Sequence, residues 1–244
     1  MSDESTNLVP NPQPAVDSAA PVVAQLHRWA IPAREYDRME ARRGRRHAYE
    51  QLTPSRTALV VVDMVDFFVA GDAYGLGIVP QIQALAHGMR EAGGTVAWVL
   101  PLVPDRPGAW GTEFYGARTV ELFRTSGGQG EVGDRLWSGL SAEDGDLVVE
   151  KRGNSAFFPG NSTLAALLEA RNIDTVVVCG KVTQVCVEST VRDAAALGYR
   201  VVMVADSCAT YSDESHNASL TVVYRSFGDV RATVEVLELL RAGT

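Results

Sequence analysis

From residue 57 onward, the chain alternates short apolar runs with longer segments in which apolar residues recur every three or four positions. The short runs are rich in valine and other β-branched residues, which favour strands, whereas the longer spacing is typical of amphipathic helices. The runs predict strands at 57–62, 95–100, 146–150, 175–180, 200–205 and 229–232. Strands that alternate with helices predict a mostly parallel sheet, covered on both faces and joined by right-handed crossovers.

Helices are predicted between these strands. The clearest carries Ile78, Ile82, Leu85 and Met89 at helical spacing and tolerates a proline in its first turn. The other helices are predicted at 34–50, 117–123, around 164–168, from 184 onward, at 214–224, and at the end of the chain through 240. A long stretch rich in glycine and proline separates the second and third strands, and it is a candidate for shaping a pocket or a subunit contact.

The composition of the chain excludes several classes of function. The 244 residues, with 46% hydrophobic and 21% charged side chains, are typical of one soluble globular domain. A net charge of -8 argues against a nucleic-acid or membrane partner, and no apolar run approaches the ~20 residues of a membrane-spanning helix. We see no secretion signal, and three scattered cysteines predict free thiols in a cytoplasmic protein. No two of the four histidines have metal-ligand spacing, so we expect no metal.

The N-terminal part has a different composition. Residues 1–34 are predicted to form a flexible arm, and residues 35–244 the folded domain, because several prolines among polar residues cannot form a core. If the arm is ordered, we expect it to lie on its own domain or on a neighbouring subunit.

Three chemically complementary residues follow strands of the predicted sheet. Asp63 ends the first strand, Lys151 the third, and Cys186 stands six residues beyond Gly180 at the end of the fourth. In parallel sheets of this kind, ligands bind outside the carboxyl ends of the strands. The sequence therefore places a carboxylate, an ammonium group and a thiol at one edge.

Each of these groups has a use in nucleophilic catalysis. A thiol on the first turn of a helix lies near unpaired N–H groups and the positive end of the helix dipole, which favours the thiolate. A carboxylate can accept the thiol proton if burial raises its pKa, and an ammonium group balances both charges. Taken singly, a buried cysteine is more often a small apolar residue, and a lysine more often a surface residue.

Around these residues the chain resembles the isochorismatase-like cysteine hydrolases. The resemblance is carried by ALVVVDMVDFF at 58–68, VVEKRGNSAFF at 148–158 and CGKVTQVCVESTVRDA at 179–194. It implies a three-layer α/β/α sandwich with a six-stranded parallel sheet in the order 3-2-1-4-5-6. It also implies an Asp63–Lys151–Cys186 triad and a cis peptide bond between Lys181 and Val182. The backbone N–H groups of Val182 and Cys186 would then form an oxyanion hole.

Departures from the family pattern refine the expectation. Val65 stands where many members carry glutamine, and with 155–158 it makes the chain more similar to the N-carbamoylsarcosine amidohydrolases than to the nicotinamidases. Nicotinamidases bind a metal through a histidine after the second strand, and residues 98–104 contain none, so the resemblance implies no metal and no other cofactor. Lys181 replaces an apolar residue before the cis bond, and its amine is expected either in the pocket or turned outward.

The remaining predictions concern the pocket and residues of structural role. The pocket is expected to include Phe68, Trp110, Phe157 and Thr183. Cys179 and Cys208 are expected to be structural, and His216 to be a surface residue at the start of a helix.

The resulting hypothesis is an enzyme. The chain is predicted to be a cysteine-dependent amidohydrolase that cleaves an amide or ureido C–N bond of a small molecule through a thioester acyl-enzyme. The resemblance also implies a homo-oligomer, either a dimer or a tetramer. One alternative is an isochorismatase-type vinyl-ether hydrolase, which would not need the nucleophilic Cys186. Another is a non-catalytic scaffold that keeps the fold.

Overall fold

A computed structural model describes residues 22–102 and 109–243. Its centre is a six-stranded sheet in the order β3-β2-β1-β4-β5-β6, with every neighbouring pair parallel. The strands are β1 (Thr57–Val62), β2 (Thr95–Pro101), β3 (Leu147–Lys151), β4 (Thr175–Lys181), β5 (Arg200–Ala209) and β6 (Asp229–Arg231). The predicted fold class and strand order are confirmed.

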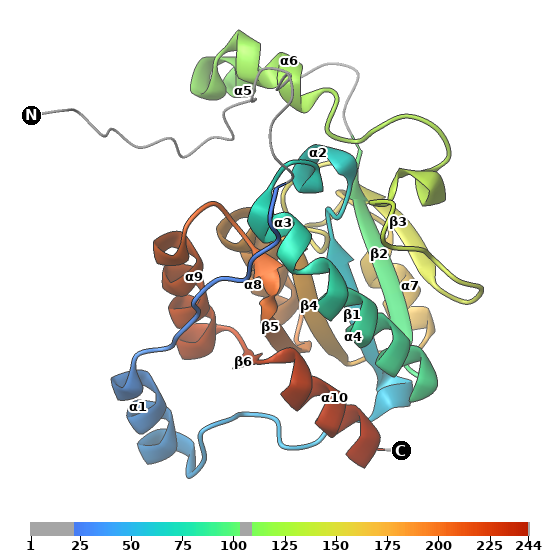
Figure 1. Cartoon of the computed structure of the whole chain (residues 1–244). Coiled ribbons are helices and arrows are strands. Elements are labelled where there is room, and N and C mark those ends of the chain that lie inside the picture. Colours follow the sequence, from blue (N-terminus) through green and yellow to red (C-terminus); the bar gives the residue numbers. More distant parts are fainter. Residues whose placement is uncertain (1–21, 103–108, 244) are drawn as a thin grey trace, which may run out of the picture.

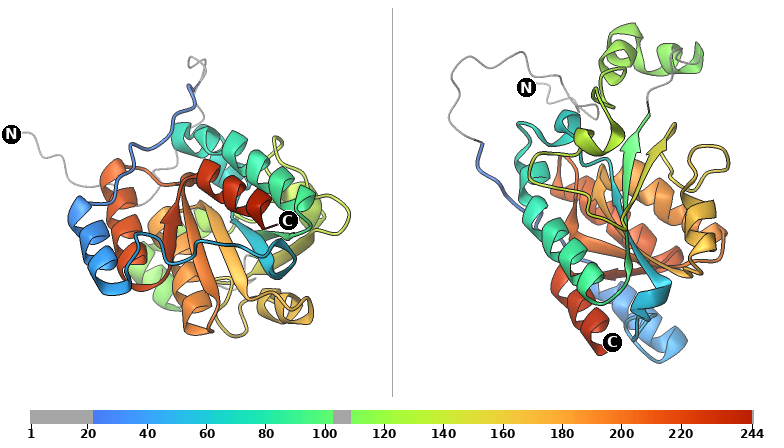
Figure 2. Two further views of the ribbon diagram at one scale, coloured as in Figure 1. Left: turned by 90° about the horizontal axis from the view of Figure 1, so that it is seen from below. Right: turned by 90° about the vertical axis from the view of Figure 1, so that its right-hand side faces the viewer.

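Helices cover both faces of this sheet. They are α1 (Ala33–Arg43), α2 (Asp66–Val69), α3 (Ala73–Gly77), α4 (Val79–Glu91), α5 (Ala109–Tyr115), α6 (Ala117–Phe123), α7 (Leu164–Ala170), α8 (Glu188–Ala196), α9 (Asp213–Ser226) and α10 (Thr233–Ala242). α4 and α10 pack together on one face, and α7, α8 and α9 lie on the other (Figure 2). Short turns are formed by η1 (Pro54–Arg56), η2 (Val132–Arg135) and η3 (Thr183–Val187).

The core lies around β1, which has β2 on one side and β4 on the other. All six residues of β1 and all seven of β4 are buried. A strand covered on both faces reads as a continuous apolar run, which is the pattern that identified these two strands in the sequence.

Several elements differ from their predicted bounds. α1 ends at Arg43, because Gly44 adopts a left-handed conformation there and caps the helix. β5 continues to Ala209, and its pairing with β4 shifts register between Val178 and Gly180. A register shift of this kind arises from unequal residue counts on the two strands, which a hydropathy pattern does not show. α5 was not predicted, and Figure 1 shows it with α6 beyond the carboxyl ends of the strands.

The N-terminal segment 22–32 is packed against the domain. It runs from beside α3 past α9 to α1 (Figure 1). The backbone N–H of Gln25 donates to the Ala73 carbonyl at 3.0 Å, and His27 and Ile31 are buried. The packed part of the chain therefore begins before residue 35, and residues 1–21 of the predicted arm lie outside the described residues. In the described parts of the chain, no helix has the length and apolarity needed to cross a membrane.

Candidate active site

The structure brings Asp63, Lys151 and Cys186 together at the carboxyl edge of the sheet. The Lys151 Nζ lies 2.7 Å from Asp63 Oδ2, and the Cys186 thiol interacts with both side chains at hydrogen-bonding range. Asp63 is only 1% exposed, Lys151 3% and Cys186 7%. The buried acid, amine and thiol expected from three distant segments therefore form one cluster.

Local backbone geometry aims Asp63 at this cluster. Asp63 follows β1 directly and has a φ of 55°, in the left-handed region that aspartate tolerates better than most residues. The turn is held from both sides, because Asp63 N–H donates to the Val99 carbonyl and Trp137 N–H donates to the Met64 carbonyl. An isolated antiparallel bridge joins Val65 to Leu136. The chain after β1 is therefore fixed by β2 and by residues within the predicted long stretch between β2 and β3.

Lys151 reaches Asp63 from two strands away. β2 lies between β1 and β3, so the two backbones are ~10 Å apart at the usual strand spacing of about 4.8 Å. Lys151 is the last residue of β3, and it pairs with Pro101, the last residue of β2. The Lys151 side chain therefore extends across the end of β2 to reach Asp63. The ammonium group also donates to the Gly153 carbonyl at 3.0 Å, which holds the amine over the edge.

Cys186 lies in a π-helical turn. The N–H of Val187 donates to the Val182 carbonyl at 3.2 Å, a bond to the fifth residue back, and α8 continues from this turn. The hydroxyl of Thr190 donates to the Cys186 carbonyl at 2.7 Å and accepts from Ala156 N–H at 3.1 Å. Thr190 thereby joins the turn that carries the thiol to the loop that follows Lys151.

The backbone before the turn is unusual. The peptide bond between Lys181 and Val182 is cis. Gly180 has a φ of 113°, and a Cβ at this position would lie 2.1 Å from the Val62 carbonyl oxygen. Only glycine allows β1 and β4 to approach this closely where Asp63 and the Cys186 segment diverge from the sheet.

Burial sets the protonation states of the cluster. It raises the pKa of Asp63, an effect that Lys151 opposes through its charge. Burial, reinforced by Asp63 and opposed by Lys151, raises the pKa of Cys186 to about 12. Burial alone would lower the pKa of Lys151, but the neighbouring carboxylate and thiol raise it overall. The raised pKa values of Cys186 and Lys151 favour a protonated thiol beside an ammonium group.

These shifts run against the expectation of a thiolate formed by the helix dipole. Taking the sulfur out of water disfavours its anion more strongly than the neighbouring ammonium group favours it. Both Asp63 oxygens are buried, with the Lys151 ammonium group and the Cys186 thiol as hydrogen-bonding neighbours of this carboxyl group. The carboxyl group is therefore in a position to exchange a proton with the thiol.

The four residues predicted to line the pocket differ in their burial. Phe68 is half-buried in α2, next to Phe67. Phe157 is a core residue that packs against Tyr199, and Trp110 is 64% exposed on α5. Thr183 is buried, and its hydroxyl lies 3.0 Å from His216 Nδ1. Phe157 is thus part of the core and Trp110 part of the surface, since sequence spacing does not show which way a loop residue turns.

Lys181 is not turned outward, which was one of the two orientations expected for it. Its side chain is buried, its amine lies 2.6 Å from Asp72 Oδ2, and it donates to the Phe68 carbonyl at 2.6 Å. The ring of Tyr211 lies 5.0 Å from the same amine. The cation is therefore already partnered, and it ties β4 to the α2–α3 segment.

His216 is also placed differently from its prediction. It is fully buried rather than at the surface, because α9 turns this face toward η3. Sequence reasoning missed Asp72 and Tyr211 as neighbours of Lys181, and their separation along the chain leaves no signal for it.

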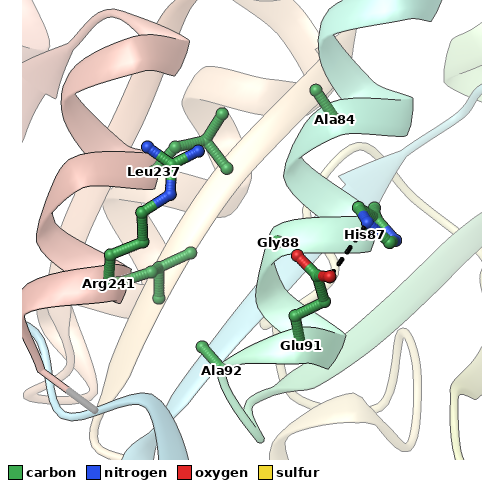
Figure 3. Close-up of a pocket in the computed structure, with 8 residues that line it drawn as sticks. Ala84, His87, Gly88, Glu91, Ala92, Leu237 and Arg241 are labelled. Carbon is green, nitrogen blue, oxygen red and sulfur yellow. Dashed lines mark ion pairs between the residues drawn. The ribbon is translucent and has the colours of Figure 1, made fainter.

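A separate groove lies away from this cluster. It has a volume of about 250 Å³ and lies between α4 and α10 (Figure 3). Its walls include Gly88 and Leu237, and the His87–Glu91 ion pair of 3.2 Å borders it. α4 runs back toward the amino ends of the strands, so its last turns are far from the carboxyl edge that carries the triad. Within residues 22–102 and 109–243, no three His, Cys, Asp or Glu side chains are grouped to hold a metal ion.

Together, the fold and the buried cluster define an α/β protein with a thiol, an acid and an amine at the carboxyl edge of its sheet. Residues 57–235 match the model of the isochorismatase domain. The chain belongs to the isochorismatase family of hydrolases.

Relatives and solved structures agree with this assignment. The chain is 34% identical to the uncharacterized isochorismatase family protein YwoC of Bacillus subtilis, over 76% of this chain and 95% of YwoC. It is 32% identical to the ureidoacrylate amidohydrolase RutB of Acinetobacter baylyi, over 75% of this chain and 83% of RutB. A cysteine hydrolase from Pseudomonas syringae pv. phaseolicola superposes with a TM-score of 0.67 at 28% identity, covering 81% of this chain and 98% of that protein. The N-carbamoylsarcosine amidase from Thermoplasma acidophilum gives a TM-score of 0.57 at 28% identity, with coverages of 73% and 96%.

Proposed function

We propose that this protein is a cysteine-dependent amidohydrolase that cleaves an amide or ureido C–N bond of a small molecule. The observation that carries the proposal is the buried contact of Asp63, Lys151 and the Cys186 thiol. A structural role would be served better by apolar residues, because burying an acid and an amine costs more than packing hydrocarbon of similar volume.

The first half-reaction acylates the enzyme. The Cys186 thiol transfers its proton to Asp63 as the sulfur attacks the carbonyl carbon, and Lys151 keeps the charges of the cluster balanced. The backbone N–H groups of Val182 and Cys186 would bind the developing oxyanion. Asp63 then returns the proton to the departing nitrogen, the C–N bond breaks, and ammonia or an amine leaves behind a thioester.

The second half-reaction regenerates the thiol. Asp63, ionised again, takes a proton from water, and the resulting hydroxide attacks the thioester carbonyl. The C–S bond breaks, the acid product leaves, and the sulfur recovers its proton from Asp63. The same carboxylate acts in both steps, which is possible because its burial keeps its pKa above the usual aspartate value.

The relatives favour ureido compounds as substrates. Two of the proteins similar to this chain are named for ureidoacrylate and N-carbamoylsarcosine, both of which carry a ureido group. We therefore place N-carbamoyl amino acids and other ureido acids first among candidates, followed by simple amides.

An ammonia-release assay tests the proposal. We expect a panel of ureido acids and small amides to yield at least one substrate, and Cys186→Ser to lower kcat by a factor on the order of 10³ or more, because the hydroxyl is a far weaker nucleophile in this setting. Cys208→Ala serves as the control, since Cys208 is a buried cysteine whose thiol donates to the Val178 carbonyl at 3.9 Å and not to Asp63 or Lys151. It should retain the wild-type kcat.

Two results would contradict this function. Full turnover by Cys186→Ser would exclude the covalent route and favour a vinyl-ether hydrolase or another non-thiol reaction. Equal and slow alkylation of Cys186 and Cys208 by iodoacetamide, measured by peptide mass spectrometry, would favour a non-catalytic scaffold, because a triad cysteine should react faster than a core cysteine.

A further inference from the structure

His27 lies outside the family domain, yet it is inserted into the structure next to the nucleophile segment. The segment 22–32 precedes the matched residues 57–235. The ring of His27 stacks on Tyr74 of α3 at 3.8 Å and on His216 of α9 at 4.3 Å, with interplanar angles of 12° and 16°. The ring is therefore a wedge between two helices that border the carboxyl edge of the sheet.

Both nitrogens of the His27 ring are engaged. Thr210 N–H donates to Nε2 at 3.0 Å, so the proton is on Nδ1, which donates to Asp213 Oδ1 at 2.7 Å. The segment is also pinned on either side of the ring, because Gln25 N–H donates to the Ala73 carbonyl at 3.0 Å and Ala30 N–H donates to the Asn217 side chain at 2.8 Å. Because hydrogen bonds hold both ring nitrogens and stacked rings cover both faces, the His27 ring is fixed in position. It in turn fixes the plane of the His216 ring that stacks on it.

His216 passes this constraint to the turn that carries the thiol. Its Nδ1 lies 3.0 Å from the hydroxyl of Thr183, and both side chains are fully buried. Thr183 directly follows the cis peptide bond and begins the π-helical turn in which Cys186 lies. A continuous path of contacts therefore runs from His27 through His216 and Thr183 to the nucleophile turn.

We propose that His27 is a positioning residue for Cys186, which the N-terminal segment supplies from outside the family domain and which acts through His216 and Thr183. The proposal rests on the nucleophilic role of Cys186 proposed above. The His27 ring itself touches no reacting atom. Its effect is to keep the π-helical turn in the one arrangement that holds the sulfur against Asp63, and loss of the ring lets His216 move away from Thr183.

The test compares three variants of the full chain. His27→Ala removes the wedge, His27→Phe keeps a stacking ring without its nitrogens, and Val23→Ser alters the same segment at a residue that is 80% exposed. Two rates are measured well below each variant's Tm, namely kcat for ammonia release and the rate constant for iodoacetamide alkylation at Cys186.

We expect His27→Ala to lower both rates by about tenfold with KM within about twofold, because a small misplacement of the nucleophile slows the chemical step more than binding. His27→Phe should recover most of the loss, to within about threefold of wild type, since it restores the stacked ring. Val23→Ser should match wild type. A folded His27→Ala with wild-type alkylation and kcat would overturn the proposal, as would an equal loss in Val23→Ser.

A double-mutant cycle tests the route. Thr183→Val removes the hydroxyl that meets His216 while keeping the shape of the side chain. If the effect of His27 passes through Thr183, adding His27→Ala to Thr183→Val should lower the alkylation rate by no more than about twofold further. Additive losses would overturn the route. Because alkylation needs no substrate, this result is independent of whether an amide substrate is found, so failure of this inference and failure of the proposed function can be told apart.

Discussion

Asp63 combines deep burial with a charged neighbour. It is 1% exposed, and the ammonium group of Lys151 lies 2.7 Å from its Oδ2. The same amine also donates to the Gly153 carbonyl at 3.0 Å. A buried carboxylate that is compensated in charge and lies beside a thiol is able to take the thiol proton.

These protonation states predict the pH dependence of the reaction. Under the proposed mechanism, the active form needs Asp63 ionised and the Cys186 thiol protonated. Because burial raises the pKa of Asp63 above 3.8, kcat/KM should fall as the pH drops through a midpoint higher than that of an ordinary aspartate. Since the pKa of Cys186 is raised to about 12 and that of Lys151 is also raised, activity should hold from neutral into alkaline pH. A pH profile of kcat/KM checks both limbs, and an acid midpoint at or below 3.8 would contradict the assignment of Asp63 as the buried base.

At the scale of elements, the π-helical turn η3 is positioned by contacts from neighbouring segments. Its carbonyl at Cys186 accepts from Thr190, whose oxygen in turn accepts from Ala156 N–H after β3. One hydroxyl therefore couples the turn that carries Cys186 to the loop that follows Lys151.

Removing this hydroxyl should uncouple the turn from the loop. We expect Thr190→Val to lower the free energy of unfolding by ~1–3 kcal/mol, because the buried Ala156 N–H loses its acceptor, and to reduce kcat by about tenfold. Thr221→Val is the matched control, since Thr221 makes the same kind of bond to a carbonyl four residues back, at 2.8 Å, on α9. Denaturant unfolding and steady-state kinetics measure the two effects. Equal kinetic losses in both variants would show that the coupling through Thr190 has no special role.

At the scale of the whole molecule, a buried ion pair joins parts of the chain that are 109 residues apart. The ammonium group of Lys181 at the end of β4 meets Asp72, which also caps α3. Burial lowers the pKa of this lysine, and Asp72 opposes the shift. The α2–α3 segment with Phe68 is thereby fixed beside the cis peptide bond, so the pair organises the surroundings of the site without entering it.

The two partners of this ion pair should not be equivalent. Asp72→Asn leaves the ammonium group of Lys181 buried without its counter-charge, and we expect a loss of about 3 kcal/mol in the free energy of unfolding. Lys181→Met leaves a carboxylate that is 23% exposed and partly hydrated, so the loss should be at most about 1 kcal/mol. Asp174→Asn provides the control, because the Arg56–Asp174 pair is also 2.6 Å long but mostly exposed, and should cost less than about 1 kcal/mol. Equal losses at positions 72 and 181 in urea denaturation would contradict this asymmetry.

The sequence by itself determined where the strands lie and the positions of two of the three candidate site residues, whereas the strand order was implied only by the resemblance to a known family. Continuous apolar runs locate β1 and β4 because both faces of these strands are buried, and Asp63 and Lys151 directly follow or end their strands. Cys186 was placed within a few residues of β4, although its turn is π-helical rather than α-helical. These features follow from local periodicity and from the rule that parallel strands end at a common edge.

Only the tertiary structure decided the protonation states and the partners of buried polar residues. The resting thiol results from burial among residues of β1, β3 and η3, which no local pattern records. The pairing of Lys181 with Asp72, the burial of His216 and the insertion of His27 all join residues more than 30 positions apart. Sequence periodicity shows which face of a helix or strand is buried. Which residues pack against that face depends on how distant segments of the chain come together in the tertiary structure.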